Sequence, residues 1–340
     1  MNRVLVIGFG KVSRTLAAMM NDHSARLHDM GLDFRTIGVF TCSRGNVADE
    51  QGIDMRKLLD DVSSHGRFTG PLTSISTLEA CRELDYDVMV ELSPLNVTNK
   101  GEPAISHISA ALTRGKHVVT ANKGPVAFAY QELSRLARDN GCRFLFESTV
   151  MDGAPVFNLV SRCMKANAIT GFSGILNSTT NYVLTRMESG LTMDEAIHEA
   201  VGMGAAEADP SNDIDGWDAA AKVAVLSRVL LGADITPLEV RRSGIRDVTP
   251  KMIADAAACG KRLKLMCRGK IMGRGVDASV GVEEVDKNDV FATLSFRDSG
   301  ISLESDLLSP HIVIHKKNKK TTLHDTAFGV LEDMISVFTP

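Results

Sequence analysis

A strand, a glycine turn and a helix at the start of the chain constrain its fold most. Residues 3–7 form an apolar run typical of a buried strand, and an apolar helical pattern follows from about Val12 to Met20. Gly8-Phe9-Gly10-Lys11-Val12-Ser13 stands between them. Gly8 permits a tight turn, and Gly10 lets the backbone approach a pyrophosphate at the helix amino terminus. This segment predicts dinucleotide binding, although Ser13 replaces the third glycine of the usual pattern.

Strand and helix patterns alternate through the first 140 residues. Strands are expected at 34–40, 88–92 and 116–120, with helices at 104–112 and 130–138. Such alternation predicts an α/β fold with a Rossmann-type, doubly wound parallel sheet. From residue 143 the pattern changes, and a second sheet is expected to contain segments 144–147, 168–176, 277–282, 291–296 and 312–315.

Composition excludes several classes of protein. A length of 340 residues suggests about two domains, and the net charge of −4 gives no general attraction to nucleic acid. The basic run Lys316, Lys317, Lys319 and Lys320 lacks aromatic residues and is interpreted as a surface turn. Six cysteines without zinc spacing indicate reduced thiols and a cytoplasmic protein. No apolar run approaches the roughly 20 residues that span a membrane.

The loop after the second strand bears on the choice of nucleotide. An NAD-binding chain usually has an acidic residue there, which binds the ribose 2′-hydroxyl. This strand ends instead in Phe40-Thr41-Cys42-Ser43-Arg44. Ser43 and Arg44 could accept a 2′-phosphate, which favours NADP with NAD as the alternative. The alternative interpretation is that Arg44 is a surface residue of a polar loop and does not contact the nucleotide.

Two lysines are candidates for chemistry on a carbonyl group. Hydride addition to a carbonyl creates an alkoxide, which needs a nearby cation or proton donor. Lys123 follows a predicted parallel strand, at the edge where doubly wound sheets bind ligands. Lys222 lies near the start of an apolar helix, four residues after Asp218. An exposed ion pair is the alternative interpretation of that spacing.

Carboxylates are dense just before Lys222. Glu207, Asp209, Asp213, Asp215 and Asp218 stand within twelve residues, in a segment rich in small residues. The glycine and glutamate spacing of a calcium-binding EF-hand is absent. Glu207 could pair with a substrate ammonium group, while Lys222, held by Asp218, donates a proton.

Four motifs together resemble one enzyme family. They are Gly8-x-Gly10, Thr120-Ala121-Asn122-Lys123, Gly174-Ile175-Leu176-Asn177-Ser178-Thr179-Thr180-Asn181, and Glu207-Ala208-Asp209-Pro210 continuing through Asp218 and Lys222. Their order and types are similar to those of homoserine dehydrogenases across nearly the whole chain. The resemblance implies the reversible reduction of L-aspartate 4-semialdehyde to L-homoserine, in the biosynthesis of threonine, methionine and isoleucine. Together with the loop at Ser43 and Arg44, it predicts an NADP-preferring enzyme.

The resemblance also implies a domain plan. Residues 1–140 would form the NAD(P)-binding domain, completed by a carboxyl-terminal helix at 320–340. Residues 141–319 would form an α+β catalytic and dimerisation domain with a mixed sheet, so that a homodimer is expected. The chain ends soon after the last helix, and feedback inhibition through a further regulatory domain is not expected.

Roles for individual residues follow from the same resemblance. Lys222 would be the proton donor and Lys123 a second essential lysine. Substrate would be bound by Glu207, Asp213, Asp218 and Thr180. By the resemblance, the cofactor would contact Phe9, Val12, Ser93, Lys123 and Gly204. The glycine turn adds Gly8, Gly10 and Lys11 to the expected cofactor site, and the loop after the second strand adds Arg44. A sodium or potassium ion would be held, largely through backbone carbonyls, by Glu147, Val150, Asp152 and Ala154.

Three positions depart from the family pattern. Ser178 replaces a glycine of the Asn-Gly-Thr run, and Ser13 replaces the third glycine of the cofactor turn. Residues 321–327 stand where a glycine-rich turn is expected before the last helix. The absence of the glycine-rich turn bears on the nicotinamide side of the cofactor site more than on the lysine chemistry.

Two other functions remain as alternatives. Another NAD(P)-dependent amino-acid or keto-acid reductase could share this architecture. Aspartate-semialdehyde dehydrogenase is disfavoured because no cysteine lies in a suitable nucleophile motif. A catalytically silent nucleotide sensor is the non-enzyme alternative, but it would not need both Lys123 and Lys222.

Overall fold

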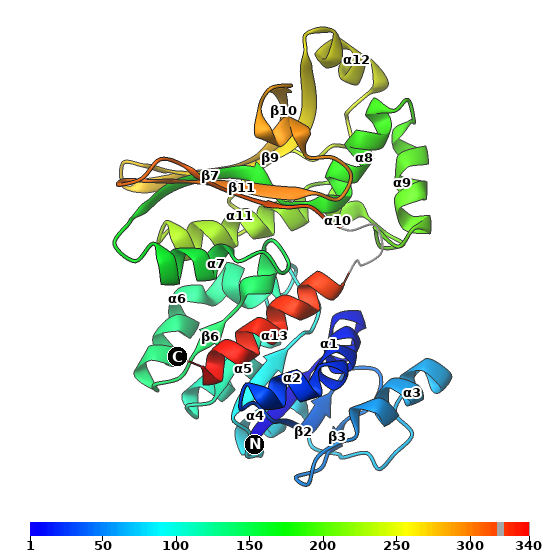
Figure 1. Ribbon diagram of the computed structural model, residues 1–340, viewed down its shortest axis with the longest axis vertical. Coiled ribbons are helices and arrows are strands. Elements are labelled where there is room, and N and C mark those ends of the chain that lie inside the picture. Colours follow the sequence, from blue (N-terminus) through cyan, green and yellow to red (C-terminus); the bar gives the residue numbers. More distant parts are fainter. Residues whose placement is uncertain (318–322, 340) are drawn as a thin grey trace. The chain divides into compact units, whose positions relative to one another are not determined.

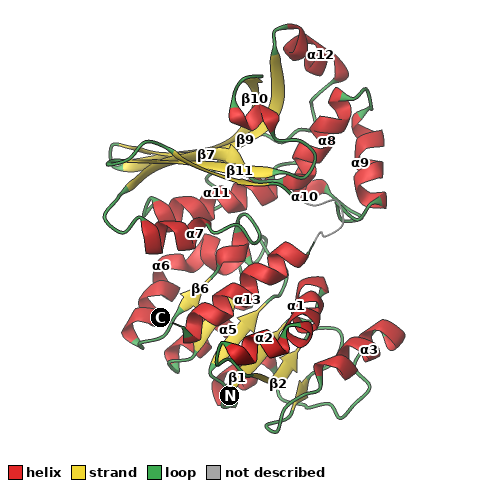
Figure 2. Cartoon of the chain, viewed as in Figure 1, coloured by secondary structure: helices red, strands yellow, loops and turns green. Residues whose placement is uncertain are grey.

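The computed structural model describes residues 1–317 and 323–339, which fall into two compact units (Figure 1). The first unit is formed by residues 1–153 together with the carboxyl-terminal segment from Leu323, and the second by the residues between them. In both units strands are combined with helices, so the α/β class expected from the sequence is confirmed (Figure 2).

The first unit contains a six-stranded sheet of the order β3-β2-β1-β4-β5-β6. Its strands are β1 (Asn2–Ile7), β2 (Phe34–Phe40), β3 (Val47–Ala48), β4 (Val88–Glu91), β5 (His117–Thr120) and β6 (Phe144–Leu145). All neighbours pair in parallel except the short edge strand β3, which is antiparallel to β2. The order reverses between β1 and β4, as in a doubly wound Rossmann-type sheet.

Helices connect these strands and share their core. They are α1 (Lys11–Asp22), α2 (Ser24–Asp29), α3 (Met55–His65), α4 (Thr77–Glu83), α5 (Ala104–Thr113), α6 (Lys123–Asp139), the 3-10 helix η1 (Glu147–Thr149) and α13 (His324–Phe338). Leu16 of α1 packs in one cluster with Val4 and Val6 of β1. Val330 and Met334 of α13 are fully buried in the same cluster. The end of the chain therefore belongs to the core of the first unit.

The second unit contains a mixed sheet of the order β12-β11-β7-β9-β10-β8. Its strands are β7 (Ile169–Ile175), β8 (Arg241–Arg242), β9 (Lys261–Met272), β10 (Gly275–Asp286), β11 (Ser299–Ser305) and β12 (His311–His315). Only the pairing of β8 with β10 is parallel among the described strands of this sheet.

Helices of the second unit pack on this sheet. They are α7 (Val156–Asn158), the π-helical turn η2 (Leu159–Cys163), α8 (Ser178–Glu188), α9 (Met193–Gly202), α10 (Ser211–Ile214), α11 (Trp217–Leu230), α12 (Pro250–Ala258) and the 3-10 turn η3 (Val290–Thr293). Helix α11 runs along one face of the sheet and contacts β9 and β10 (Figure 1). From Ala219 to Arg228 every residue of α11 is buried except Lys222.

Two strand predictions are wrong. Residues 144–147 were expected in the second sheet, but β6 pairs with β5 in the first sheet and Glu147 begins η1. A short apolar run does not specify which sheet it joins. Here α6 connects β5 to β6, and the two strands pair in parallel in the first sheet. Residues 291–296 were expected to form a strand, but Asp289 accepts a hydrogen bond from Phe291 N at 2.8 Å and caps η3. A local side-chain bond thus replaces strand pairing.

The division between the units falls at residue 153, whereas the sequence suggested residue 140. Segment 147–149 stays with the first unit because it is bonded to α13. Asp333 of α13 accepts a hydrogen bond from Glu147 N at 2.8 Å, and Ser148 Oγ donates to the carbonyl of Thr326 at 2.8 Å. Contacts between residues about 180 positions apart are not visible in a sequence pattern.

Some expectations fall outside the described residues. The predicted helix at 320–340 corresponds to α13, but residues 320–322 and 340 lie outside the described part, as do Lys319 and Lys320 of the basic run. All six cysteines are free thiols. No helix within 1–317 or 323–339 is long and apolar enough to cross a membrane.

Candidate active site

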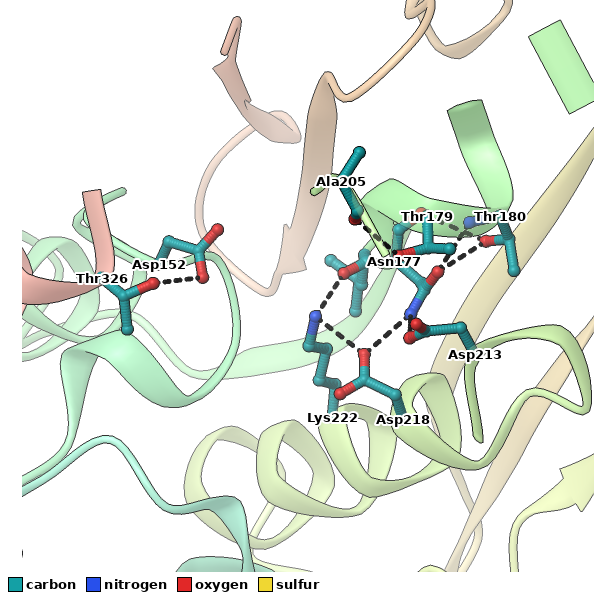
Figure 3. Close-up of polar contacts among 10 residues, drawn as sticks. Asp152, Asn177, Thr179, Thr180, Ala205, Asp213, Asp218, Lys222 and Thr326 are labelled. Atoms are coloured by element: carbon teal, nitrogen blue, oxygen red, sulfur yellow. Dashed lines mark hydrogen bonds and ion pairs between the residues drawn. The ribbon is translucent and has the colours of Figure 1, made fainter. Parts of the chain in front are cut away.

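Asn177 connects the end of β7 to two carboxylates. It is the N-cap of α8, where its Oδ1 accepts hydrogen bonds from Thr180 N at 2.8 Å and from Thr180 Oγ1 at 2.9 Å. Its Nδ2 donates to Asp213 Oδ1 at 2.6 Å and to Asp218 Oδ2 at 2.9 Å (Figure 3). One side-chain amide therefore fixes the start of a helix and holds two acidic groups together.

Lys222 completes this cluster from α11. Its Nζ lies 3.0 Å from Asp218 Oδ2 and donates to the carbonyl oxygen of Leu176 at 2.7 Å (Figure 3). Only 12% of the Lys222 side chain and 19% of the Asp218 side chain are exposed. An exposed surface ion pair, the alternative interpretation of this spacing, is therefore excluded by the structure.

The surroundings of the cluster are electrostatically unusual. Burial, together with the negative charge of Asp218, raises the pKa of the Asp213 carboxyl, while the hydrogen bond from Asn177 and the charge of Lys222 act against that rise. Cys267 of β9 lies near Lys222, and burial raises the pKa of its thiol to about 12. This cysteine is therefore a neutral group and not a thiolate nucleophile.

Glu207 and Gly204 lie in the loop between α9 and α10. Gly204 has a φ of +68° just after α9, a conformation that favours glycine. Glu207 is exposed, and no hydrogen bond or ion pair joins its side chain to another described residue. Thr180 differs from both, since it is fully buried with its hydroxyl bonded to Asn177.

The glycine turn of the first unit has the geometry of a phosphate-binding loop. Gly8 has a φ of +89°, and a Cβ atom there would lie 2.8 Å from the carbonyl carbon of Leu92. Gly10 is the N-cap of α1, and a Cβ atom there would meet nothing within 4 Å. The amino terminus of α1 thus fits a pyrophosphate, because its N–H groups have no side-chain cap. Ser13 is buried in place of the third glycine.

Other expected cofactor residues lie around this turn or at the carboxyl ends of neighbouring strands. Phe9 is buried and packs edge-on against Phe68, with 5.5 Å between ring centroids. Ser93 follows β4, and Lys123 begins α6 directly after β5. Asn122 caps α6 by accepting a hydrogen bond from Gly124 N at 2.9 Å. Lys11 and Val12 begin α1.

Arg44 is held in place by backbone groups. Its Nη1 donates to the carbonyl oxygen of Gly66 at 2.7 Å, and its own N–H donates to Thr41 Oγ1 at 2.9 Å. Arg44 O in turn accepts from Phe68 N at 3.0 Å. These bonds fix the loop after β2, where the adenosine ribose of a bound dinucleotide lies in folds of this type.

The segment expected to hold a monovalent cation is ordered by α13. Glu147 and Val150 are buried, and Asp152 has a φ of +54°. Asp152 Oδ1 accepts a hydrogen bond from Thr326 Oγ1 at 3.1 Å (Figure 3), and Ala154 is buried as well. No group of three or more histidine, cysteine, aspartate or glutamate side chains within the described ranges could hold a metal ion.

Two polar residues received no role from the sequence pattern. Asn177 was quoted within a motif but received no role, although it bridges Asp213 and Asp218. Its position between an apolar strand and a helical run is an N-cap signal that could have drawn attention to it. Glu91, at the end of β4, was read only as part of a strand, and nothing in the pattern marks it.

Comparison with known proteins identifies the family. Residues 155–335 match the family model described as homoserine dehydrogenase, and residues 8–147 match the model for the NAD-binding domain of homoserine dehydrogenase. The NAD(+)-dependent homoserine dehydrogenase of Pseudomonas canavaninivorans is 34% identical over 340 residues, covering 98% of this chain and 96% of that protein. The chain belongs to the homoserine dehydrogenase family. It is an NAD(P)-dependent oxidoreductase.

Other family members agree in length and fold. Homoserine dehydrogenase of Methanocaldococcus jannaschii is 32% identical, with 98% of each chain covered. A hyperthermophilic archaeal homoserine dehydrogenase solved with NADPH superposes with a TM-score of 0.82 at 27% identity, covering 99% of this chain and 97% of that one. The enzyme of Thiobacillus denitrificans superposes equally well at 26% identity, covering 99% of this chain and 73% of that one.

Proposed function

We propose that this family member catalyses the reversible reduction of L-aspartate 4-semialdehyde to L-homoserine, prefers NADP, and uses Lys222 as the proton donor. The observation that carries the proposal is the mostly buried cluster of Lys222, Asp218, Asn177 and Asp213. A bound nicotinamide cofactor would supply the hydride. The residues of the chain would bind the substrate and transfer the proton to or from its oxygen atom.

Lys222 is suited to proton transfer at an oxygen atom. The Asp218 carboxylate and the Leu176 carbonyl hold its ammonium group in one place. In the reduction, this group would donate a proton to the oxygen that gains negative charge at the former aldehyde carbon. In the oxidation, the neutral amine would accept the proton of the homoserine hydroxyl group. Lys123 would be the second lysine, close to the substrate and the nicotinamide.

The carboxylates are proposed to bind the amino acid part of the substrate. Glu207 would pair with the ammonium group because its side chain is exposed and the structure gives it no other described partner. Asp213 and Asp218 would line the same pocket. Thr180 would act through Asn177, because its hydroxyl is buried against that residue.

The preference for NADP is proposed from the loop after β2. Arg44 uses one N–H for Gly66, and a guanidinium group has five donors, so it can bind a 2′-phosphate without leaving that position. Gly8, Phe9, Gly10, Lys11 and Val12 would hold the pyrophosphate through their backbone, and Ser93 and Gly204 would contact the cofactor elsewhere. A solved relative contains NADPH, whereas another is named NAD(+)-dependent, so NAD is the alternative.

A sodium or potassium ion is proposed at residues 147–154. Oxygen ligands suit such ions, and Glu147, Val150, Asp152 and Ala154 offer backbone carbonyls in a mostly buried segment. The role would be structural, in the segment that bonds to α13. Replacing sodium and potassium by tetramethylammonium at constant ionic strength should lower the melting temperature; unchanged stability would contradict the site.

A homodimer is proposed from the exposed apolar side chains of β12. Ile312 and Ile314 are 49% and 38% exposed, and they pair with Ser302 and Gly300 on one face of the mixed sheet. A second copy of the chain would cover them. Sedimentation analysis should show a dimer that the double change of Ile312 and Ile314 to glutamate dissociates; a monomeric unaltered protein would contradict the proposal.

The decisive test is an assay of homoserine oxidation that follows the absorbance of reduced cofactor, with NADP and with NAD. Lys222→Ala should lower kcat by about 100-fold or more, the usual loss for a general acid-base group, while cofactor binding persists. Lys251→Ala is the matched control, because Lys251 forms an exposed i,i+4 pair with Asp255 on α12. Its kcat should stay unchanged.

The outcomes separate the alternatives. Turnover with NADP at a higher kcat/KM than with NAD supports the proposed reaction and cofactor preference. Cofactor binding without turnover of homoserine would point to a nucleotide sensor or to a reductase of another carbonyl compound. Wild-type activity in Lys222→Ala would remove Lys222 from the chemistry.

A further inference from the structure

Glu91 is a fully buried carboxyl group at the carboxyl end of β4. Its exposure is 0%, although charged side chains are almost never fully buried without partners. It stands at the edge of the first sheet where the glycine turn, Ser93 and Lys123 also lie. Neither the proton transfer nor the substrate binding proposed above uses it.

The carboxyl group joins two neighbouring strands. Glu91 Oε1 accepts hydrogen bonds from Ser93 N at 2.9 Å and from the Ser93 hydroxyl. Glu91 Oε2 lies 2.9 Å from Thr120 Oγ1, at the end of β5. The loop after β4 and the last residue of β5 are thus tied to one side chain.

The same network reaches two further segments. Asn122 Nδ2 donates to Ser93 Oγ at 3.3 Å, while Asn122 Oδ1 caps the helix that Lys123 begins. On the other side, the turn at Gly8 packs directly against Leu92 and Ser93: a Cβ atom on Gly8 would lie 3.0 Å from Ser93 N. Glu91 therefore supports the backbone of three segments that meet at one edge.

A protonated Glu91 carboxyl group can satisfy every hydrogen bond around it. The Thr120 hydroxyl has one hydrogen and lies 2.9 Å from both the Glu91 carbonyl oxygen and Glu91 Oε2, while it accepts from Asn122 N at 3.0 Å. If its hydrogen goes to the carbonyl oxygen, Glu91 must donate to it. Burial raises the pKa of Glu91, while the hydrogen bonds from Ser93, Thr120 and Asn122 act against that rise. A glutamine amide could make the same set of bonds.

We propose that Glu91 is a positioning residue of the cofactor site, whose hydrogen bonds fix Ser93, the Asn122 cap and the Gly8 turn. This inference rests on the proposed function, in which Ser93 and Lys123 contact the cofactor. Its effect on catalysis passes through those two residues, because Glu91 itself has no exposed surface.

Four single variants test the proposal by steady-state kinetics and melting temperature. Glu91→Ala and Thr120→Val each remove part of the hydrogen-bond network. For Glu91→Ala we expect KM for the cofactor to rise and kcat to fall, each by about tenfold or more. The reason is that small misplacements of catalytic groups strongly reduce the rate. Thr120→Val should show smaller changes in the same directions, and it preserves side-chain shape if Glu91→Ala does not fold. Glu91→Gln should restore kcat and KM to within about threefold of the unaltered enzyme.

Tyr86→Phe is the matched control. Tyr86 is fully buried just before β4 and donates a hydrogen bond to Cys81 O at 2.8 Å, so its loss should lower the melting temperature without changing kcat or KM. A purely structural role for Glu91 predicts the same behaviour for Glu91→Ala.

The results have distinct meanings. Kinetic loss in Glu91→Ala or Thr120→Val with recovery in Glu91→Gln supports the inference. Wild-type kinetics in the folded Glu91→Ala or Thr120→Val proteins would overturn it, as would a Glu91→Gln enzyme no better than Glu91→Ala. Failure of the proposed function is recognised separately, because the unaltered protein would then not oxidise homoserine at all.

Discussion

At the scale of single residues, the mostly buried charge of Asp218 is balanced by an ion pair and a hydrogen bond. Lys222 and Asn177 both approach the same carboxylate oxygen of Asp218. A buried ion pair is costly to desolvate, and satisfying it with further hydrogen bonds is what makes it tolerable. The arrangement therefore fits a site built to orient an ammonium group.

Replacement of Asp218 tests this orientation. In Asp218→Asn the ammonium group of Lys222 loses its charged partner, so we expect kcat to fall by about 10- to 100-fold, as for other misplaced acid-base groups, with a smaller change in KM for homoserine. Asp255→Asn breaks the exposed pair with Lys251 on α12 and serves as the control. Equal kcat values in the two variants would show that the Asp218 carboxylate does not orient Lys222.

At the scale of elements, a buried polar side chain of the second unit joins a strand to a helix by hydrogen bonds. Lys264 of β9 is fully buried, and its Nζ donates to Asn181 Oδ1 of α8 at 3.0 Å and to the Leu294 carbonyl after η3 at 2.7 Å. One lysine thus connects a strand, a helix and a loop inside the second unit. Burial lowers the pKa of Lys264 to about 8.

This lysine makes a pH prediction with a definite sign. The unfolded chain keeps the Lys264 proton up to a pH of about 10.4, whereas the folded chain releases it near pH 8. The unfolded state therefore binds more protons between these values, and the free energy of unfolding should rise with pH in that window, by up to about 3 kcal/mol. Below pH 8 the buried Lys264 side chain is charged in the folded protein, and the free energy of unfolding is lowered by the full cost of burying that charge.

Urea unfolding of the unaltered protein and of Lys264→Met at pH 7.5, 8.5 and 9.5 measures this contribution. The stability of the unaltered protein relative to the variant should increase across the series, because methionine carries no proton. A difference between the two proteins that does not change with pH would contradict a lowered pKa of Lys264.

At the scale of the whole molecule, the carboxyl-terminal helix α13 packs into the unit formed by the amino-terminal residues. Helix α13 is more than 170 residues from the rest of the first unit in sequence, yet Val330 and Met334 are fully buried in its core. The first unit is thus assembled from both ends of the chain, and its stability depends on residues that the nucleotide motif does not contain.

Met334→Ala tests this dependence. Truncating a fully buried methionine typically costs about 2–5 kcal/mol, which is a large part of the stability of one domain. We expect a lower urea midpoint for the transition that abolishes cofactor binding. Phe328→Ala, an exposed position of α13, is the control. Equal midpoints for the two variants would argue against a core role of Met334.

Sequence alone determined the features that depend on local order. Gly8 and Gly10 between a strand and a helix predicted the nucleotide-binding turn, because only backbone freedom and a helix amino terminus are needed there. The spacing of Asp218 and Lys222 placed both on one helix face, and their charges marked them as candidates. The four motifs, in their order, indicated the family that the comparisons confirm.

Tertiary structure decided what depends on distant residues. Whether Asp218 and Lys222 were exposed or half-buried followed from α11 packing on the mixed sheet, which no spacing reveals. The sheet that β6 joins, the burial of Glu91 and the bridge made by Asn177 likewise required elements far apart in the chain to meet. Burial and hydrogen bonding are properties of the packed molecule, so they assign roles that side-chain type and order leave open.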